Sequence, residues 1–328
     1  MKTFIGVMLA VFLIGTPISA LAAAKVVAYV PNWIDLSSFC ETIDYSKLTH
    51  INIAFENPTN DSGDLSFNPN NEPVIAKAHA SQVKVLISIG GGSASDNKTL
   101  KARYFNLLTA ANRPAFVAKL ADYVEMHHFD GVDVDIEGPS INDDYGAFIH
   151  NLAAALKPKG KLLTAALSKG YGGDHVPDSV FEHFDFVNIM AYDGTGPWNP
   201  NAPGQHSSLE FAKENVSHWL GRGLAKNKAV LGLPFYGYGF GEAYQKRDYP
   251  YSKIIAEYPG AEYLDQVGKT IWYNGFPTIK AKTRYVVEQE LGGVMIWSLD
   301  YDVKGEKSLL SAIDEAMNSK PAASPAVK

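Results

Sequence analysis

Short apolar runs alternate along the chain with segments whose apolar side chains recur every three or four residues. Each run is rich in β-branched or aromatic residues and short enough to form one buried strand. The runs lie at 26–31, 49–55, 83–91, 128–139, 161–167, 184–192, 229–236 and 293–299. Helical spacing recurs near 74–80, 114–127, 145–156, 211–220, 283–291 and 308–317. Eight strands that are mostly separated by helices predict an α/β fold, a single (β/α)8 TIM barrel.

The connection between the seventh and eighth predicted strands is too long for one simple helical crossover. Residues 238–280 are rich in Tyr, and we expect them to form a short excursion between these two strands. A doubly wound open sheet is the alternative fold. It is disfavoured because no glycine-rich phosphate-binding turn follows the first strand.

The two ends of the chain differ in composition from the middle. The first 24 residues contain an apolar run at 4–15 and end in small residues, which is typical of a secretory signal peptide. Cleavage after Ala22 or Ala24 fits this pattern. We therefore expect a signal peptide at 1–24, a catalytic domain at 25–318 and a disordered Pro/Ala-rich tail at 319–328.

Composition narrows the function classes that need to be considered. Hydrophobic types make up 46% of the 328 residues, which is enough for a large core. The formal net charge of −6 gives no basic surface for nucleic acid. Cys40 is the only cysteine, so no internal disulfide can form. No segment after the signal peptide is long and apolar enough to span a membrane, and we expect a secreted monomer, either extracellular or periplasmic.

The fourth predicted strand carries acidic residues where a core strand is normally apolar. In "HFDGVDVDIEGP", the residues Asp133, Asp135 and Glu137 alternate with aliphatic residues. Alternating side chains point to opposite faces of a strand, so the aliphatic ones face the helices and the acids face the barrel interior. Successive acids rise about 6.6 Å, which brings Glu137 to the C-terminal rim where active sites of this fold lie. Asp130 has the other parity and is expected to be structural support.

Three carboxyl groups in one buried column cannot all be ionised at low cost. Repulsion and desolvation are expected to raise at least one pKa, so that the lower acids keep a proton on Glu137 and make it a general acid. A structural hydrogen-bonded acid or a Mg²⁺ or Ca²⁺ site is the alternative. The catalytic interpretation is favoured, and no metal or other cofactor is expected, because no pair of histidines has the spacing of a metal-binding helix.

Four motifs in strand order resemble one known family. "DGVDVDIE" is similar to the Asp-x-x-Asp-x-Asp-x-Glu signature of glycoside hydrolase family 18, the retaining chitinases and endo-β-N-acetylglucosaminidases. "SIGG" at 88–91, "MAYD" at 190–193 and "MIWSLD" at 295–300 resemble its third, sixth and last strand motifs. The resemblance therefore covers nearly the whole chain after the signal peptide. It implies a (β/α)8 barrel without a cofactor.

The resemblance also implies substrate-assisted chemistry, in which the 2-acetamido oxygen of the sugar attacks its own C1. Glu137 would protonate the leaving oxygen and later deprotonate the incoming water. Asp135 would hold the acetamido N–H, with Asp133 as its buried partner. Tyr192 would donate a hydrogen bond to the acetamido oxygen.

Further residues are expected to bind the sugar or support the site. Asp193 would bind the sugar at the reacting position, and Trp297 would form the floor on which that sugar stacks. Tyr29, Tyr236 and Trp198 are expected to face the sugar from the strand ends and loops. The residues that we expect to support the site are Ser88, Gly90, Gly91 and Met190.

The chain departs from the family pattern near the acid. Gly138 and Pro139 follow Glu137 where many members have Tyr-Pro, and "GGGSAS" lacks the aromatic residue that long-chain chitinases often place there. These departures predict a shallow, open groove. The expected function is hydrolysis of β-1,4 bonds in chitin or other N-acetylglucosamine-containing glycans. The alternatives are the same chemistry on N-glycan cores, or a non-catalytic chitin-binding, lectin-like relative.

Overall fold

The computed structural model describes residues 24–319, and the eight predicted strands close into a parallel barrel. Around the barrel the strand order is β1-β12-β7-β6-β5-β4-β3-β2. The barrel strands are β1 (Lys25–Pro31), β2 (His50–Ala54), β3 (Lys84–Gly90), β4 (Gly131–Asp135), β5 (Leu162–Leu167), β6 (Phe186–Ile189), β7 (Ala229–Pro234) and β12 (Gly293–Trp297). The predicted (β/α)8 fold is therefore confirmed. The signal peptide predicted at the N-terminus and the tail predicted at the C-terminus lie outside the described residues, except for their innermost positions.

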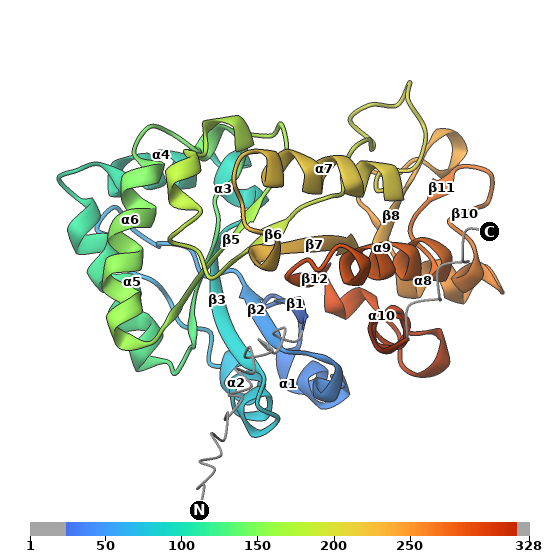
Figure 1. The fold of residues 1–328 in the computed structure, drawn as a ribbon, viewed down its shortest axis with the longest axis horizontal. Coiled ribbons are helices and arrows are strands. Elements are labelled where there is room, and N and C mark those ends of the chain that lie inside the picture. Colours follow the sequence, from blue (N-terminus) through green and yellow to red (C-terminus); the bar gives the residue numbers. More distant parts are fainter. Residues whose placement is uncertain (1–23, 320–328) are drawn as a thin grey trace, which may run out of the picture.

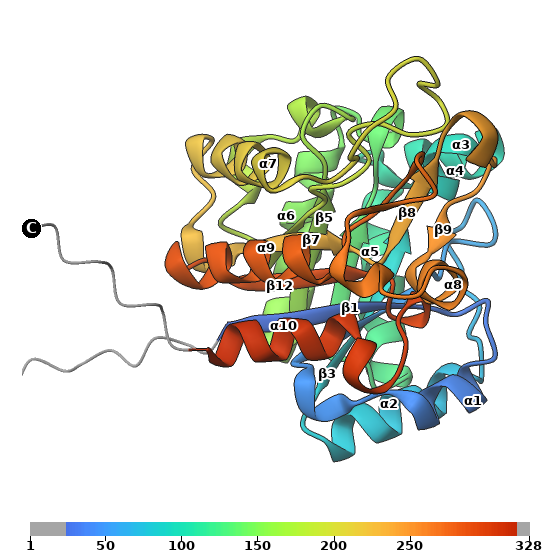
Figure 2. The same cartoon turned by 90° about the vertical axis from the view of Figure 1, so that its right-hand side faces the viewer.

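Helices surround the strands on the outside of the barrel (Figure 1). They are α1 (Leu36–Phe39), α2 (Asn71–Ala80), α3 (Gly92–Asp96), α4 (Lys98–Leu108), α5 (Arg113–Met126), α6 (Tyr145–Leu156), α7 (Leu209–Gly221), α8 (Tyr251–Glu257), α9 (Phe276–Glu288) and α10 (Leu309–Asn318). Figure 2 shows α9 and α10 side by side along the barrel. No α-helix joins β5 to β6, where short 3-10 turns make the connection.

The excursion predicted between the seventh and eighth barrel strands is a small second sheet with a helix. Its antiparallel strands run in the order β10-β11-β8-β9 and comprise β8 (Tyr236–Gly239), β9 (Tyr249–Pro250), β10 (Gln266–Val267) and β11 (Ile271–Trp272). The excursion ends earlier than predicted, because α9 begins at Phe276 and not near residue 283. The available signal was the proline in its first turn, a position that favours helix starts.

The core of the barrel has an outer and an inner part, which the parallel strands separate, and a third small cluster of Tyr236, Tyr238 and Phe240 lies in the excursion. Outward-facing aliphatic residues such as Val132 and Val134 of β4 pack against the surrounding helices. Inside the barrel a smaller apolar cluster includes Val27, Phe186 and Met295. Side chains inside a barrel of this size fill its interior in layers. The polar residues of the interior therefore need partners within the barrel.

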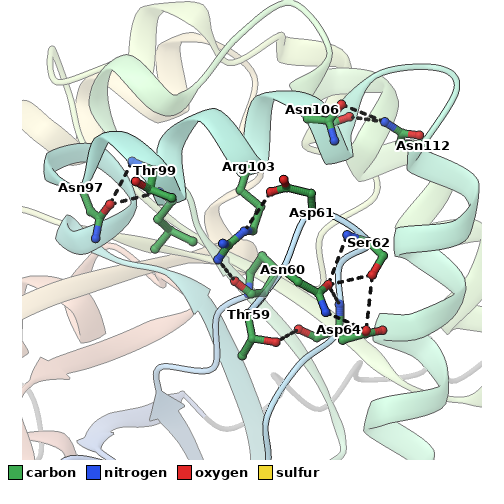
Figure 3. Close-up of polar contacts among 12 residues, drawn as sticks. Thr59, Asn60, Asp61, Ser62, Asp64, Asn97, Thr99, Arg103, Asn106 and Asn112 are labelled. Carbon is green, nitrogen blue, oxygen red and sulfur yellow. Dashed lines mark hydrogen bonds and ion pairs between the residues drawn. The ribbon is translucent and has the colours of Figure 1, made fainter.

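The long loop after β2 is fastened to α4 by polar contacts (Figure 3). Asn60 Oδ1 accepts hydrogen bonds from the backbone N–H groups of Ser62, at 3.1 Å, and Asp64, at 3.2 Å, which closes a tight turn. Arg103 of α4 pairs with Asp61 at 3.3 Å. The loop therefore leaves the end of β2 in a defined direction. Within residues 24–319, no helix combines the length and hydropathy of a membrane span.

Candidate active site

The middle layer of the barrel interior is polar. Six buried polar residues face inward at this level, namely Tyr29, Asn52, Ser88, Asp133, Thr164 and Asn188. Neighbouring strands place several of these residues in register, since Tyr29 pairs with Asn52, Ser88 with Asp133 and Asp133 with Thr164. The acidic strand therefore enters an environment that supplies hydrogen-bond donors.

Asp133 is surrounded by donors. Its Oδ2 accepts hydrogen bonds from Tyr29 Oη at 2.6 Å and Ser88 Oγ at 2.7 Å. Its Oδ1 accepts from Thr164 Oγ1 at 2.6 Å and Asn188 Nδ2 at 3.3 Å. Burial raises the pKa of Asp133, and these hydrogen bonds oppose that rise because they stabilise the charged form. Asp133 is therefore the carboxyl of the column that is best able to stay ionised.

Tyr29 was predicted to face the sugar, and the structure places it in the barrel interior. It is only 1% exposed and its hydroxyl donates to Asp133, so its contact with a sugar stays a prediction. Its ring lies against Trp297, with 5.4 Å between ring centroids. Tyr29 therefore holds the buried acid from within the barrel. The two-residue period of β1 shows that Tyr29 faces the barrel interior. It does not show how far the side chain lies below the mouth.

Asp135 lies above Asp133 on the same face and has the opposite surroundings. Among the described residues, no hydrogen-bond donor reaches its buried Oδ1. Burial raises the pKa of Asp135 well above its usual range, and the charges of Glu137 and Asp133 raise it further. Asp135 is therefore protonated more readily than an ordinary aspartate, and its buried Oδ1 has no hydrogen-bond partner among the described residues.

Glu137 lies two residues beyond the end of β4 in extended backbone. Burial raises its pKa to about 7, and the charges of Asp193 and Asp96 add to the shift. The sequence predicted that desolvation and repulsion by the lower acids would raise this pKa. Burial is the first cause, and the charges that add to it are those of Asp193 and Asp96. Ser95 Oγ donates to the backbone carbonyl of Glu137 at 2.7 Å and so ties α3 to the acid.

Tyr192 follows β6 and points toward the upper acids. The charges of Asp135, Asp193 and Glu137 all raise its pKa, after the larger effect of burial. Its hydroxyl has only the sulfur of Met295 nearby, at 4.0 Å, as a hydrogen-bond partner among the described residues. The Tyr192 hydroxyl therefore has no oxygen partner among the described residues, and it lies within the electrostatic influence of Asp135.

Asp193 is held in a sparsely populated backbone conformation, with φ at 61°. Its Oδ1 accepts hydrogen bonds from Tyr236 Oη at 2.6 Å and Tyr238 Oη at 3.0 Å. Its backbone N–H donates to His206 Nδ1 at 3.3 Å. Tyr236 is 3% exposed and holds Asp193, and its predicted contact with the sugar stays a prediction. Tyr238 and His206 were not predicted, because they lie in the excursion and in a polar loop.

A buried lysine lies behind this loop. Lys282 of α9 donates to the carbonyl oxygen of Ser207 at 2.7 Å, to Ser207 Oγ at 2.6 Å and to Asn274 Oδ1 at 2.7 Å. Ser207 Oγ in turn donates to the carbonyl of Ala191, next to Tyr192, at 2.6 Å. Burial lowers the pKa of Lys282 to about 7. No sequence signal distinguished this lysine from a surface residue of an amphipathic helix.

Three aromatic rings form a row on one side of the barrel mouth. Trp297 and Phe55 lie 5.8 Å apart with an angle of 25° between their planes, and Phe55 and Trp33 lie 6.3 Å apart at 26°. Trp33 is 65% exposed. Trp297, which was predicted as the sugar floor, thus begins a row that leads outward over β2 and β1. We call this set of Trp297, Phe55 and Trp33 the aromatic row.

The predicted support residues lie around β3 and β4. Gly90 and Gly91 have φ values of 105° and 72°, and a side chain on Gly90 would overlap the backbone of Asp135. Asp130 accepts a hydrogen bond from the Val85 backbone N–H at 2.8 Å and so joins β3 to β4 outside the interior. Met190 packs inside the barrel mouth.

Other residues that the sequence singled out lie farther from the column. Trp198 is 60% exposed, and its ring packs edge-on against Tyr238 at 5.3 Å. Across residues 24–319, no group of three or more His, Cys, Asp or Glu side chains has an arrangement that could hold a metal ion.

Comparison with known proteins identifies the family. The model of "Glycosyl hydrolases family 18" matches residues 25–302. The solved GH18 chitinase ChiB from the chitin utilization locus of Flavobacterium johnsoniae is 38% identical, with a TM-score of 0.83, and the match covers 90% of this chain and 94% of that one. A chitinase from Bacteroides thetaiotaomicron is 28% identical, with a TM-score of 0.79 and coverage of 90% and 97%. Mouse chitotriosidase-1 is 27% identical over 86% of this chain and 74% of its own length.

The parallel barrel, with its column of carboxyl groups rising to the C-terminal mouth, is that of a glycosidase. The matched model covers most of the chain. The chain belongs to glycosyl hydrolase family 18, as its four strand motifs predicted.

Proposed function

We propose that this protein is a secreted, retaining hydrolase that cleaves β-1,4 bonds of chitin or chito-oligosaccharides by substrate-assisted catalysis. The observation that carries this proposal is an unpartnered pair of groups beside Glu137. Within the described part of the chain, Asp135 offers a buried acceptor without a donor, and Tyr192 offers a hydroxyl without an oxygen partner. An acetamido group has both a donor N–H and an acceptor carbonyl, so it satisfies both groups at once. The chitinase relatives support the choice of substrate.

The reaction would proceed in two steps. Glu137 donates its proton to the glycosidic oxygen while the acetamido carbonyl oxygen attacks C1, which breaks the glycosidic bond and forms an oxazolinium ring. Tyr192 orients that oxygen, and Asp135 accepts the N–H hydrogen bond and stabilises the positive charge of the ring. Glu137, now a carboxylate, removes a proton from water as the water attacks C1, which breaks the bond between C1 and the acetamido oxygen and restores the acetamido group. The product keeps the configuration of the substrate.

Glu137 is suited to both steps because its pKa is near neutral. A general acid and base works best when its pKa lies close to the working pH. Burial raises the pKa of Glu137 to about 7, so the residue can give up and regain a proton near neutral pH. Secretion is proposed from the N-terminal segment, which has the composition of a signal peptide.

The proposal is tested with defined substrates and mass spectrometry of the products. Chitotetraose should be cleaved, and cellotetraose, which lacks the acetamido group, should not. A high-mannose glycoprotein serves as the second substrate. Cleavage of the glycoprotein alone would assign the protein to N-glycan cores, and binding of chitotetraose for hours without cleavage would make it a lectin. Efficient turnover of cellotetraose would contradict substrate-assisted catalysis.

A further inference from the structure

The aromatic row indicates which way a bound chain would run across the barrel mouth. The row comprises Trp297, Phe55 and Trp33, which follow β12, β2 and β1. In the closed barrel β5 and β6 lie on the opposite side from β1 and β2. A sugar chain that stacks on the row at one end and passes Glu137 therefore continues over the loops that follow β4, β5 and β6. On the proposed function, these loops receive the leaving-group sugar.

Two exposed aromatic residues lie on these loops. Trp198 follows β6 and was predicted from the sequence as a sugar contact. Tyr171 follows β5 and was not predicted. Tyr171 is 50% exposed, so about half of its surface is open to solvent in a loop whose neighbours Lys169 and Gly170 are also exposed.

The ring of Tyr171 lies directly against the residue after the acid. Gly138 follows Glu137 in the chain and has φ at 53°, a conformation that favours glycine. Any side chain at position 138 would overlap the ring carbons and hydroxyl of Tyr171. A side chain at Gly172 would likewise overlap the backbone of Gly138. The loop after β5 therefore packs closely against Gly138, the residue next to Glu137.

This fit accounts for the departures of the chain from the family pattern. An aromatic residue is missing at position 138 and also in the segment "GGGSAS" after β3. The space that a side chain at 138 would fill is taken by an aromatic ring from the neighbouring strand's loop. The barrel mouth therefore has an aromatic surface next to the acid, although the sequence around β3 and β4 predicts none.

We propose that Tyr171 is the platform on which the leaving-group N-acetylglucosamine stacks. The flat ring offers an apolar surface to the apolar face of a pyranose, and Gly138 allows it to lie close to the proton donor. The inference rests on the proposed function. It adds a specificity-determining residue that acts on the sugar being expelled and not on the sugar that forms the oxazolinium ring.

Two substrates distinguish an effect on the leaving-group sugar from an effect on the sugar that forms the oxazolinium ring. Chitotetraose places sugars on both sides of the cleaved bond, whereas chitobiose oxazoline carries no leaving-group sugar and needs only water. In Tyr171→Ala, kcat/KM for chitotetraose should fall about tenfold, which corresponds to about 1.4 kcal/mol. Hydrolysis of the oxazoline should stay within about twofold of the wild type. Tyr171→Phe keeps the ring and should match the wild type on both substrates.

Three results have distinct meanings. If Tyr171→Ala has the same kcat/KM for chitotetraose as the wild type, Tyr171 is not the platform. If Tyr171→Ala loses activity equally on both substrates, Tyr171 acts through Glu137 and not on the leaving-group sugar, which also overturns the proposal. If the wild type cleaves neither substrate, the proposed function itself fails. If Tyr171→Ala does not fold, Tyr171→Leu keeps the packing against Gly138 without a flat ring, and it should show the same selective loss.

Discussion

The lower and upper parts of the β4 column contain the same kind of side chain in opposite surroundings. Asp133 at the lower level accepts four hydrogen bonds from four different strands. Asp135 at the upper level has a buried oxygen that no donor reaches among the described residues, and burial raises the pKa of Glu137 to about 7. Burial raises the pKa of all three carboxyl groups, so they differ in the number of hydrogen-bond donors that stabilise the charged form. The chain thus carries one buried acid whose charged form is stabilised by four donors and, above it, two acids whose pKa values burial raises without such donors among the described residues.

This contrast also explains why the upper level is the reactive one. A carboxylate that is saturated with hydrogen bonds is stable but has no free oxygen for a ligand. An acid that lacks partners is costly to the fold but is free to exchange hydrogen bonds and protons. Functional sites often accept such a cost in stability. The following predictions test whether the two levels differ in this way.

Glu137→Gln should have the largest effect on activity. The amide keeps the shape of the acid but has no proton to donate, so turnover of chitotetraose should fall by roughly 10³- to 10⁴-fold. Binding of chitotetraose, measured by calorimetry, should be preserved. Residual turnover above a tenth of the wild-type rate would show that another group donates the proton.

Asp135→Asn and Asp133→Asn should separate the two levels. Asp135→Asn should reduce kcat by roughly 100-fold or more, with little change in the free energy of unfolding, because no donor faces its buried oxygen. Asp133→Asn places an amide N–H₂ against hydroxyl donors and should cost about 1–3 kcal/mol of stability. Both quantities are measured on purified variants by product analysis and denaturant unfolding. Equal losses of stability in the two variants would remove the contrast.

The stability of Glu137→Gln should depend on pH. The folded-state pKa of Glu137 is about 7 and the ordinary value is 4.5, so the stability linked to this group is present below pH 4.5 and is lost as pH rises through 7. At pH 8, Glu137→Gln should therefore be more stable than the wild type by about 3 kcal/mol. Near pH 4.5 the difference should vanish. Denaturant unfolding at both pH values measures it, and a pH-independent difference would contradict the raised pKa.

The smallest predicted effect concerns the charges at the rim. Asp193 and Asp96 raise the pKa of Glu137, so removing either negative charge should lower it. The alkaline limb of the pH–activity profile should then move to lower pH by a fraction of a unit in both variants. Asp193→Asn should also lose activity, because Asp193 is proposed to bind sugar. Asp96 is exposed at the end of α3, so Asp96→Asn is the matched control. It should show the pH shift with little loss of activity.

The sequence predicted the features that depend on local alternation and failed where distant loops meet. The positions of Asp133, Asp135 and Glu137 followed from the two-residue period of a strand. The burial of Tyr29 did not, because period 2 places a side chain inside the barrel without giving its height or partner. Tyr171 and Lys282 could not be predicted either. Their roles arise from contacts with residues more than thirty positions away, which no local pattern encodes.

The pH dependence of kcat/KM for chitotetraose tests most directly whether the upper acid keeps its proton. This parameter reports the ionisation of the free enzyme. With Glu137 at a pKa of about 7, activity should fall on the alkaline side with a midpoint near pH 7. A midpoint near the ordinary glutamate value of 4.5 would show that burial leaves the acid unperturbed, and it would contradict the difference between the two levels of the column.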